Sequence, residues 1–147
     1  MFTPPVLPIT VTGMPATPVE LSEAAVEFVT ERHHATLTTL RANGTPHVVA
    51  IAFTYQPETG LVRIITDAAS QKVRNARRGG YAAVCQVDGA RWLTLEGPAT
   101  VVDTAPEVRD AENRFAVRYR PPRINPTRVV LQIEVARMLG SANLKAR

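Results

Sequence analysis

The residues best suited to hold a charged ligand lie between positions 63 and 75. Arg63 stands alone within an aliphatic run, and Ser70 and Lys72 enter a short predicted helix a few residues later. An anion beside the start of that helix would meet free backbone N–H groups, hydroxyl groups and positive side chains. The segment therefore predicts a phosphate cradle, with the candidate residues Arg63, Thr66, Ser70, Gln71, Lys72 and Asn75.

A simpler interpretation of the same segment stays open. Ser70 can act solely as the helix cap, and the basic residues that follow it can form a solvated face. We favour the solvated face for the three arginines further along this helix, and ligand binding for Arg63 and Lys72. Trp92, the single tryptophan, follows a predicted hairpin, and its position fits a core residue as well as a contact with the edge of a ring-shaped ligand.

The chain offers no recognisable set of side chains for acid–base or nucleophilic catalysis. His33 and His34 end the first predicted helix, where attraction to the helix dipole explains them, and His47 is isolated in a strand. The sequence lacks Ser/His/Asp and Cys/His signatures and paired carboxylates. Cys85 is the only cysteine, so a metal site of the usual Cys/His kind has nothing to build on. We therefore predict no catalytic side chain and no metal.

Length and charge narrow the class of partner. A chain of 147 residues fits one domain, and its net charge of +4 comes almost entirely from arginine. The planar fork of arginine suits phosphate and carboxylate groups. Aromatic residues make up 5% and do not alternate with the arginines, as a base-stacking surface would need. An anionic small molecule is therefore favoured over nucleic acid.

The start of the chain predicts no targeting signal. Residues 1–20 are interrupted by five prolines and lack the basic and apolar blocks of a secretory leader, so we expect a flexible proline-rich arm. No run of about 18 apolar residues is present, which argues against a membrane span. With a single cysteine, the cytoplasm is the expected compartment.

These candidate residues must be positioned by strands joined through hairpins. Asn43-Gly44 is expected to supply the positive backbone dihedrals of a tight hairpin turn, and Asp88-Gly89 is a second hairpin signal. The absence of crossover helices and of a G-x-G-x-x-G motif argues against a Rossmann sheet. Residues 21–147 therefore predict one mainly β domain, a six-stranded antiparallel barrel with inserted helices. The strands are expected at 35–40, 46–55, 61–66, 81–87, 91–102 and 129–135, and the helices at 22–32, 71–78 and 104–119.

Several stretches together resemble the pyridoxamine phosphate oxidase-like superfamily, whose fold is the FMN-binding split barrel. The resemblance covers about 21–144 and is nearest to the deazaflavin-dependent branch and its biliverdin reductases. Its members share a homodimer with the cofactor in a groove between the two chains. The stretches that carry the resemblance are Glu31-Arg32-His33, Leu37 to Ala42, Pro46 to Ala50, Ser70-Gln71-Lys72, Gln86 to Leu93, the glycine-ended strand Arg91 to Gly97, and Arg118 to Arg120 with Pro122-Arg123.

The resemblance implies a cofactor and a reaction. Coenzyme F420 is the expected cofactor, and FMN is the alternative. Gln86 and Trp92 would contact the cofactor edge, and a tryptophan where the oxidases usually carry glutamine weakens the FMN assignment. The C-terminus lacks the segment with which pyridoxal phosphate-forming oxidases hold their substrate.

In such an enzyme the reduced deazaflavin would pass a hydride from C5 to a conjugated acceptor, and the protein would supply position and electrostatics. The resemblance points to the reduction of biliverdin to bilirubin. The candidate partners for the biliverdin propionates are Arg120, Arg123 and Arg128. Two alternatives remain: reduction of another acceptor, such as a quinone or an enone, and binding of a flavin or tetrapyrrole without turnover.

Overall fold

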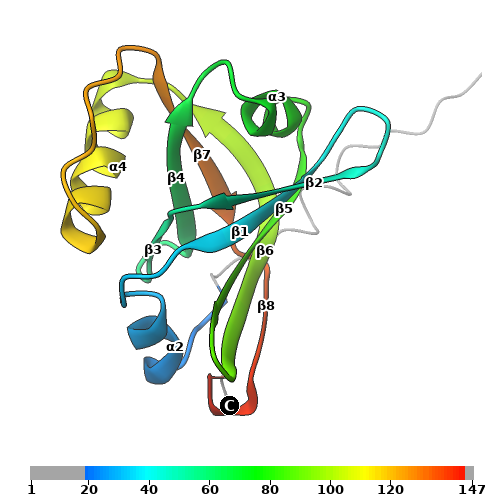
Figure 1. The fold of residues 1–147 in the computed structure, drawn as a ribbon, viewed down its shortest axis with the longest axis vertical. Helices are drawn as coiled ribbons and strands as arrows, with labels where there is room; N and C mark the ends of the chain where they lie inside the picture. Colours follow the sequence, from blue (N-terminus) through cyan, green and yellow to red (C-terminus); the bar gives the residue numbers. More distant parts are fainter. Residues whose placement is uncertain (1–18, 145–147) are drawn as a thin grey trace, which may run out of the picture.

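The computed structural model describes residues 19–144, so the predicted arm lies outside the described residues except for Val19 and Glu20. Within this range the strands form one antiparallel sheet that curls into a barrel (Figure 1). The strand order is β2-β1-β5-β6-β7-β4-β3, and β8 pairs with β6. The strands are β1 (Ala35–Leu40), β2 (Pro46–Ile51), β3 (Thr54–Gln56), β4 (Leu61–Asp67), β5 (Gly80–Asp88), β6 (Arg91–Val102), β7 (Arg128–Glu134) and β8 (Arg137–Gly140).

The helices lie outside the barrel. The helical segments are α2 (Glu23–Phe28), α3 (Gln71–Arg77), α4 (Ala105–Arg118) and the short 3-10 turn η1 (Ala142–Leu144). Helix α4 packs beside β4 and β7, and α3 lies across one end of the barrel (Figure 1). The described helices are all too short and too polar to span a membrane.

The predicted mainly β class is confirmed, but eight strands replace the expected six. The expected strand 46–55 is two strands, because the chain breaks at Ala52 and Phe53. At this break, side chains take the place of a neighbouring strand: the Tyr119 hydroxyl accepts from the Phe53 N–H, and Arg118 donates to the Phe53 carbonyl. Strand β8 was not expected, and it extends the edge of the long strand β6.

Local signals placed the turns well and the helix ends less well. The Ser22 hydroxyl caps α2 by accepting from the Ala25 N–H at 3.1 Å, yet α2 ends at Phe28 instead of about residue 32. Gly44 and Gly89 adopt positive φ in the two predicted hairpins. Asn43 does not, which corrects the expectation; its side chain accepts instead from the Thr45 N–H at 3.0 Å.

The inward and outward faces of the sheet differ sharply. Inward positions such as Leu37, Val84 and Leu95 are fully buried. The cross-strand register places the alternate positions of β2, β1, β5 and β6 on a common outward face. We call this surface the outer face, and its exposed apolar side chains are Leu40, Val48, Tyr81, Val87 and Trp92.

Candidate functional site

A cluster of hydroxyl groups lies where β4 leads into α3. Thr66 is near the end of β4, Ser70 immediately precedes α3, and their hydroxyl oxygens lie 3.4 Å apart. The Ser70 hydroxyl donates to the Asp67 carbonyl at 2.9 Å and makes no capping bond to the helix. Ser70 therefore occupies the predicted cap position, while its hydroxyl oxygen stays available as an acceptor.

Lys72, two residues after Ser70, is a partly buried cation. Burial lowers the pKa of Lys72, and attraction to Asp67 partly opposes that effect. Asp67 holds its charge because hydrogen bonds from Thr127 and from the Ala69 N–H lower the pKa of its carboxyl. In the described part of the chain, Lys72 is not within ion-pair distance of any carboxylate. Such an ammonium is well suited to an anionic group supplied by a ligand.

Arg63 does not join the hydroxyl cluster. Side chains alternate along β4, so Arg63 points away from the core face that holds Val62 and Ile64 and away from Thr66. Its guanidinium donates to the Gln56 side chain at 2.7 Å, and burial lowers the pKa of Arg63, with smaller effects from charges on α4. The structure thus divides the predicted cradle between two faces of one strand, and a cofactor contact by Arg63 stays a prediction.

Asn75 and Gln71 form a hydrogen-bond chain between α3 and β1. The Gln71 amide donates to the Asn75 carbonyl oxygen at 2.7 Å, and the Asn75 amide donates to the Thr39 hydroxyl at 2.9 Å. Arg78 also donates to Asn75, which is almost fully buried. The amide of Asn75 is therefore occupied in anchoring α3, and a ligand contact by this side chain is not evident.

Gln86 lies in the interior, and its expected contact with a cofactor edge stays a prediction. It is fully buried on the inward face of β5. Its amide nitrogen donates to the Phe28 carbonyl at 2.8 Å, and its oxygen accepts from Arg118 at 2.6 Å. Both ends of the amide are therefore bound within the chain.

Trp92 is exposed on the outer face, far from Lys72. It lies at the hairpin end of β6, whereas α3 packs near Ala99 at the other end of this stretch of strand. Seven residues of strand separate the two positions, which corresponds to about 23 Å. One chain therefore does not bring Trp92 to the cluster around Lys72.

The three arginines predicted for substrate differ in their surroundings. Arg128 is nearly buried and pairs with Glu112 at 2.9 Å, which makes it a poor candidate for a propionate. Arg120 and Arg123 are exposed in the proline-rich segment after α4. Arg123 lines a surface pocket with Ile124, so Arg120 and Arg123 stay the better candidates.

A partly buried arginine at the end of α4, Arg118, was not among the predicted site residues. The Arg118 guanidinium donates to the Glu31 carbonyl at 2.9 Å, to the Phe53 carbonyl and to the Gln86 side chain. It also stacks over the Phe53 ring at 4.7 Å from the centroid. The hydrogen-bond partners of Arg118 lie 32 or more positions away in the sequence, so no local motif predicts that Arg118 would bind them.

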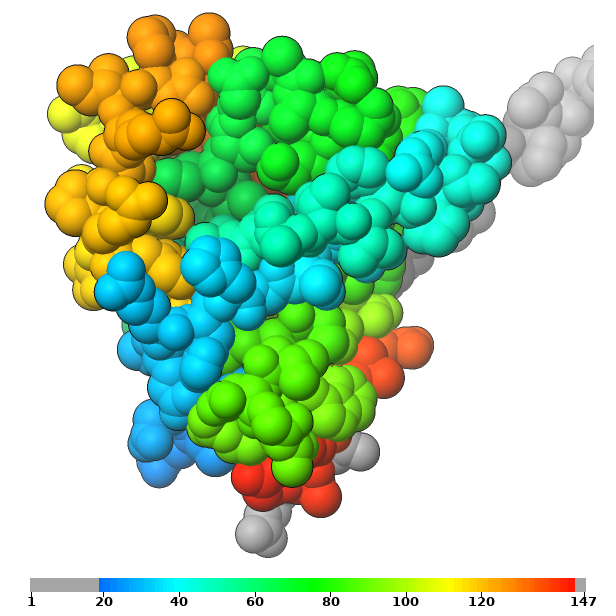
Figure 2. Space-filling view, viewed as in Figure 1, coloured from blue at the N-terminus to red at the C-terminus, as the bar shows by residue number. Residues whose placement is uncertain are grey.

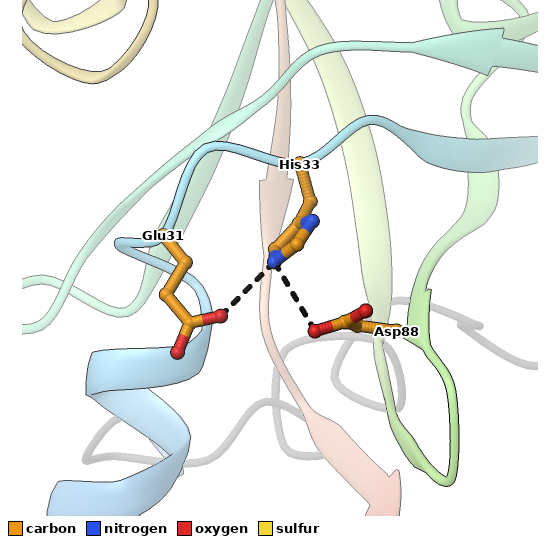
Figure 3. A group of neighbouring side chains, drawn as sticks. All are labelled: Glu31, His33 and Asp88. Carbon is orange, nitrogen blue, oxygen red and sulfur yellow. Dashed lines mark hydrogen bonds and ion pairs between the residues drawn. The ribbon is translucent and has the colours of Figure 1, made fainter.

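A second missed cluster joins the turn after α2 to the β5–β6 hairpin (Figure 3). The His33 ring nitrogen lies 3.0 Å from Glu31 and 3.7 Å from Asp88. Arg91 pairs with both carboxylates. Hydrogen bonds from Arg91 and then from His33 lower the pKa of Glu31 to about 2. Although a histidine and two carboxylates could ligate a metal, Arg91 already forms an ion pair with each of the two carboxylates.

The surface is hollowed between β2 and α3, with β4 recessed behind (Figure 2). His47 belongs to β2, and its Nδ1 is the one buried side-chain nitrogen or oxygen without a hydrogen-bond partner among the described residues. Native structures rarely leave such an atom unpaired. The hollow therefore lies between the strand that carries His47 and the helix that carries Lys72.

Comparison with known proteins decides the family. The family model described as pyridoxamine 5'-phosphate oxidase matches residues 21–141. The chain belongs to this oxidase family. It is 54% identical over 135 residues to the F420H(2)-dependent biliverdin reductase of Mycobacterium tuberculosis (strain CDC 1551 / Oshkosh), an alignment that covers 92% of this chain and 98% of that protein. The family resemblance inferred from the sequence is thereby confirmed.

Several solved structures have a fold similar to that of this chain. The conserved hypothetical protein Rv2991 from Mycobacterium tuberculosis matches with a TM-score of 0.70 at 25% identity, over 86% of this chain and 88% of that one. A structure described as an F420 reductase matches with a TM-score of 0.64 at 22% identity, over 80% of this chain and 98% of that one. HupZ from Group A Streptococcus matches with a TM-score of 0.68 at 15% identity, over 86% and 98% of the two chains. The last two likenesses concern the fold alone.

For a member of the oxidase family, the residues present fit a phosphorylated cofactor. Among the described residues, the Lys72 ammonium has no carboxylate within ion-pair distance. The hydroxyls of Thr66 and Ser70 would donate to phosphate oxygens once they turn from their present partners, the Ser70 oxygen and the Asp67 carbonyl. This donor set suits an anion better than a metal.

Proposed function

We propose that this protein is an F420H2-dependent reductase that converts biliverdin to bilirubin. The observation that carries the proposal is 54% identity to an F420H(2)-dependent biliverdin reductase over nearly the whole of both chains. The partly buried ammonium of Lys72, which pairs with no carboxylate of residues 19–144, supports it, because the cofactor carries a phosphodiester and a carboxylate-rich tail. The single free cysteine agrees with action in the cytoplasm.

The chain's own contribution is binding and orientation. When bound, the reduced deazaflavin supplies the hydride. Lys72, Thr66 and Ser70 would hold the phosphate, and the exposed Arg120 and Arg123 would attract the acceptor's propionates. No side chain needs to act as a nucleophile. The chain would contribute to catalysis by holding the cofactor and the acceptor in contact.

The proposal includes a homodimer formed through the outer face. Val48 and Val87 are more than half exposed on this face, and Leu40 and Tyr81 are about half exposed. Apolar surface of this kind is typical of an interface. A second copy would also bring a Trp92 near the Lys72 end of the first chain, which one chain alone does not do.

An anaerobic titration tests the proposal. F420 and, separately, FMN are added to the purified protein and followed by fluorescence, and biliverdin is then added to the complex with F420H2. We expect tighter binding of F420 than of FMN, followed by loss of the biliverdin colour and return of the oxidised cofactor. Turnover with a quinone alone would reassign the acceptor, and binding of F420 without any turnover would favour a storage role. Failure to bind F420 would overturn the proposal.

A further inference from the structure

At one place no strand-to-strand hydrogen bonds among residues 19–144 close the barrel, and only the polypeptide chain itself joins its two edges. Strands β2 and β3 are separated in sequence by Ala52 and Phe53, yet they lie at the two ends of the strand order. Strand β2 pairs with β1, and β3 pairs with β4. The chain therefore passes from one edge of the sheet to the other at Phe53, and beyond this point β2 diverges from β4 (Figure 1). The hollow between β2 and α3 opens along this seam (Figure 2).

Phe53 cannot use the sheet to satisfy its backbone. It is 1% exposed, so both of its backbone polar groups need partners. The Tyr119 hydroxyl lies 3.3 Å from the Phe53 nitrogen and donates to the His33 carbonyl at 2.7 Å. Arg118 donates to the Phe53 carbonyl. Two consecutive side chains at the end of α4 thus take the place of a strand neighbour.

Arg118 also binds the chain segments that surround Phe53. Its other donors reach the Glu31 carbonyl and the Gln86 side chain, and its guanidinium covers the Phe53 ring. The rigid fork of arginine can bind three acceptors in set directions, whereas the single ammonium of lysine cannot reproduce that geometry. The seam is therefore tied at once to the turn before β1, to β5 and to α4.

We propose that Arg118 is a positioning residue that holds the seam open at Phe53 and so sets the width of the cofactor groove. This inference rests on the proposed function, because the groove is taken to receive F420. A folded protein without the guanidinium would let β2 shift relative to β4, and the groove would lose its fit to the cofactor ring before the fold is lost.

The test compares Arg118→Lys and Arg118→Ala with the wild-type protein in F420 binding, followed by fluorescence at a temperature where each variant gives a native circular dichroism spectrum. Arg109→Ala, an exposed arginine on the same helix, is the matched control. We expect about tenfold weaker binding for both Arg118 variants and wild-type affinity for the control. Added guanidinium ion at millimolar concentration should restore the affinity of Arg118→Ala, and equal sodium chloride should not.

A readout without cofactor keeps the two proposals separable. Hydrogen exchange at the amides of residues 51–55 should be faster in Arg118→Lys than in the wild-type protein, whether or not F420 binds. If wild-type protein fails to bind F420, the proposed function fails and the exchange result still tests the seam. Unchanged exchange at these amides, or folded Arg118 variants that bind F420 as tightly as the wild-type protein, would overturn the inference.

Discussion

Lys72 combines two properties that rarely occur together in a solvated lysine. Its ammonium is partly withdrawn from water, and no carboxylate in the described chain lies within ion-pair distance. Arg77, on the same helix, is exposed. This difference in burial favours ligand binding for Lys72 and a solvated face for Arg77, the two alternatives that the sequence alone left open.

Lys72→Ala is therefore expected to weaken F420 binding by about 1.5 to 3 kcal/mol, the range for a hydrogen bond to a charged group. Arg77→Ala removes an equal charge from the same helix and should leave affinity nearly unchanged. Fluorescence titration of both variants at moderate salt measures the difference. Equal, small losses in the two variants would return Lys72 to the solvated face.

Glu31 gives a prediction about pH and stability. Its pKa is lowered from 4.5 to about 2 by hydrogen bonds from Arg91 and His33, so its stabilising effect is present above 4.5 and is lost as the pH falls toward 2. The wild-type protein should be more stable than Glu31→Gln at neutral pH, and the difference should shrink across this range. The effect is expected to be small, because the side chain is 39% exposed.

Denaturant unfolding at a series of pH values measures this difference, with the exposed Glu27→Gln as control. A gap between the wild-type protein and Glu31→Gln that stays constant from neutral pH down to pH 2 would contradict the assignment.

At the scale of elements, β6 and the chain after β7 approach each other so closely that one position has no room for a side chain. A Cβ added at Gly97 would lie 1.8 Å from the Glu134 carbonyl oxygen. That contact is with backbone, which cannot rotate away as a side chain can. The crossing of β6 with the end of β7 therefore depends on glycine at this position.

Gly97→Ala should destabilise the protein by about 3 kcal/mol or more, toward the upper end for overpacked positions. Gly80→Ala is the control, because a Cβ at Gly80 meets nothing within 4 Å and its φ is not positive. The midpoints of urea unfolding for the two variants compare them directly. A Gly97→Ala protein as stable as Gly80→Ala would show that the two segments can separate at little cost.

Elements set by local signals were predictable, and those set by distant contacts were not. Hairpins followed from Gly44 and Gly89, because a positive φ is a property of the residue itself. The break at Phe53 depends on Arg118, 65 positions away, so no window of sequence around Phe53 reports it. For the same reason the sequence predicts one continuous strand over 46–55 where the structure has two.

The proximity of some candidate residues could be predicted, whereas their contact with a cofactor stays a prediction. Lys72 and the Thr66–Ser70 pair followed from residue type and spacing, whereas strand alternation alone would have separated Arg63 from Thr66. The interior location of Gln86 could not be inferred, because its two partners come from α2 and α4. Family resemblance supplied a position for Gln86 and Trp92 but not the face of the sheet on which each lies.

For the whole molecule, the outer face is the feature that calls for a second copy. Val48→Arg places a charge within this face, and it should shift the protein toward monomer and weaken F420 binding together. Ile124→Arg introduces the same charge at a residue that is 97% exposed in the proline-rich segment, away from the outer face. Light scattering with F420 titration measures both effects. A dimeric Val48→Arg protein would argue against this interface.

The separation of Trp92 from Lys72 along one chain has a consequence for concentration. If each groove is completed by the partner's outer face, F420 binds the dimer more tightly than the monomer, and by linkage the cofactor must strengthen subunit association by the corresponding factor. Dilution would then release cofactor, and saturating cofactor would hold dilute subunits together. The amount of active enzyme would rise more steeply than the amount of chain, so the supply of cofactor and the abundance of the protein would be sensed jointly.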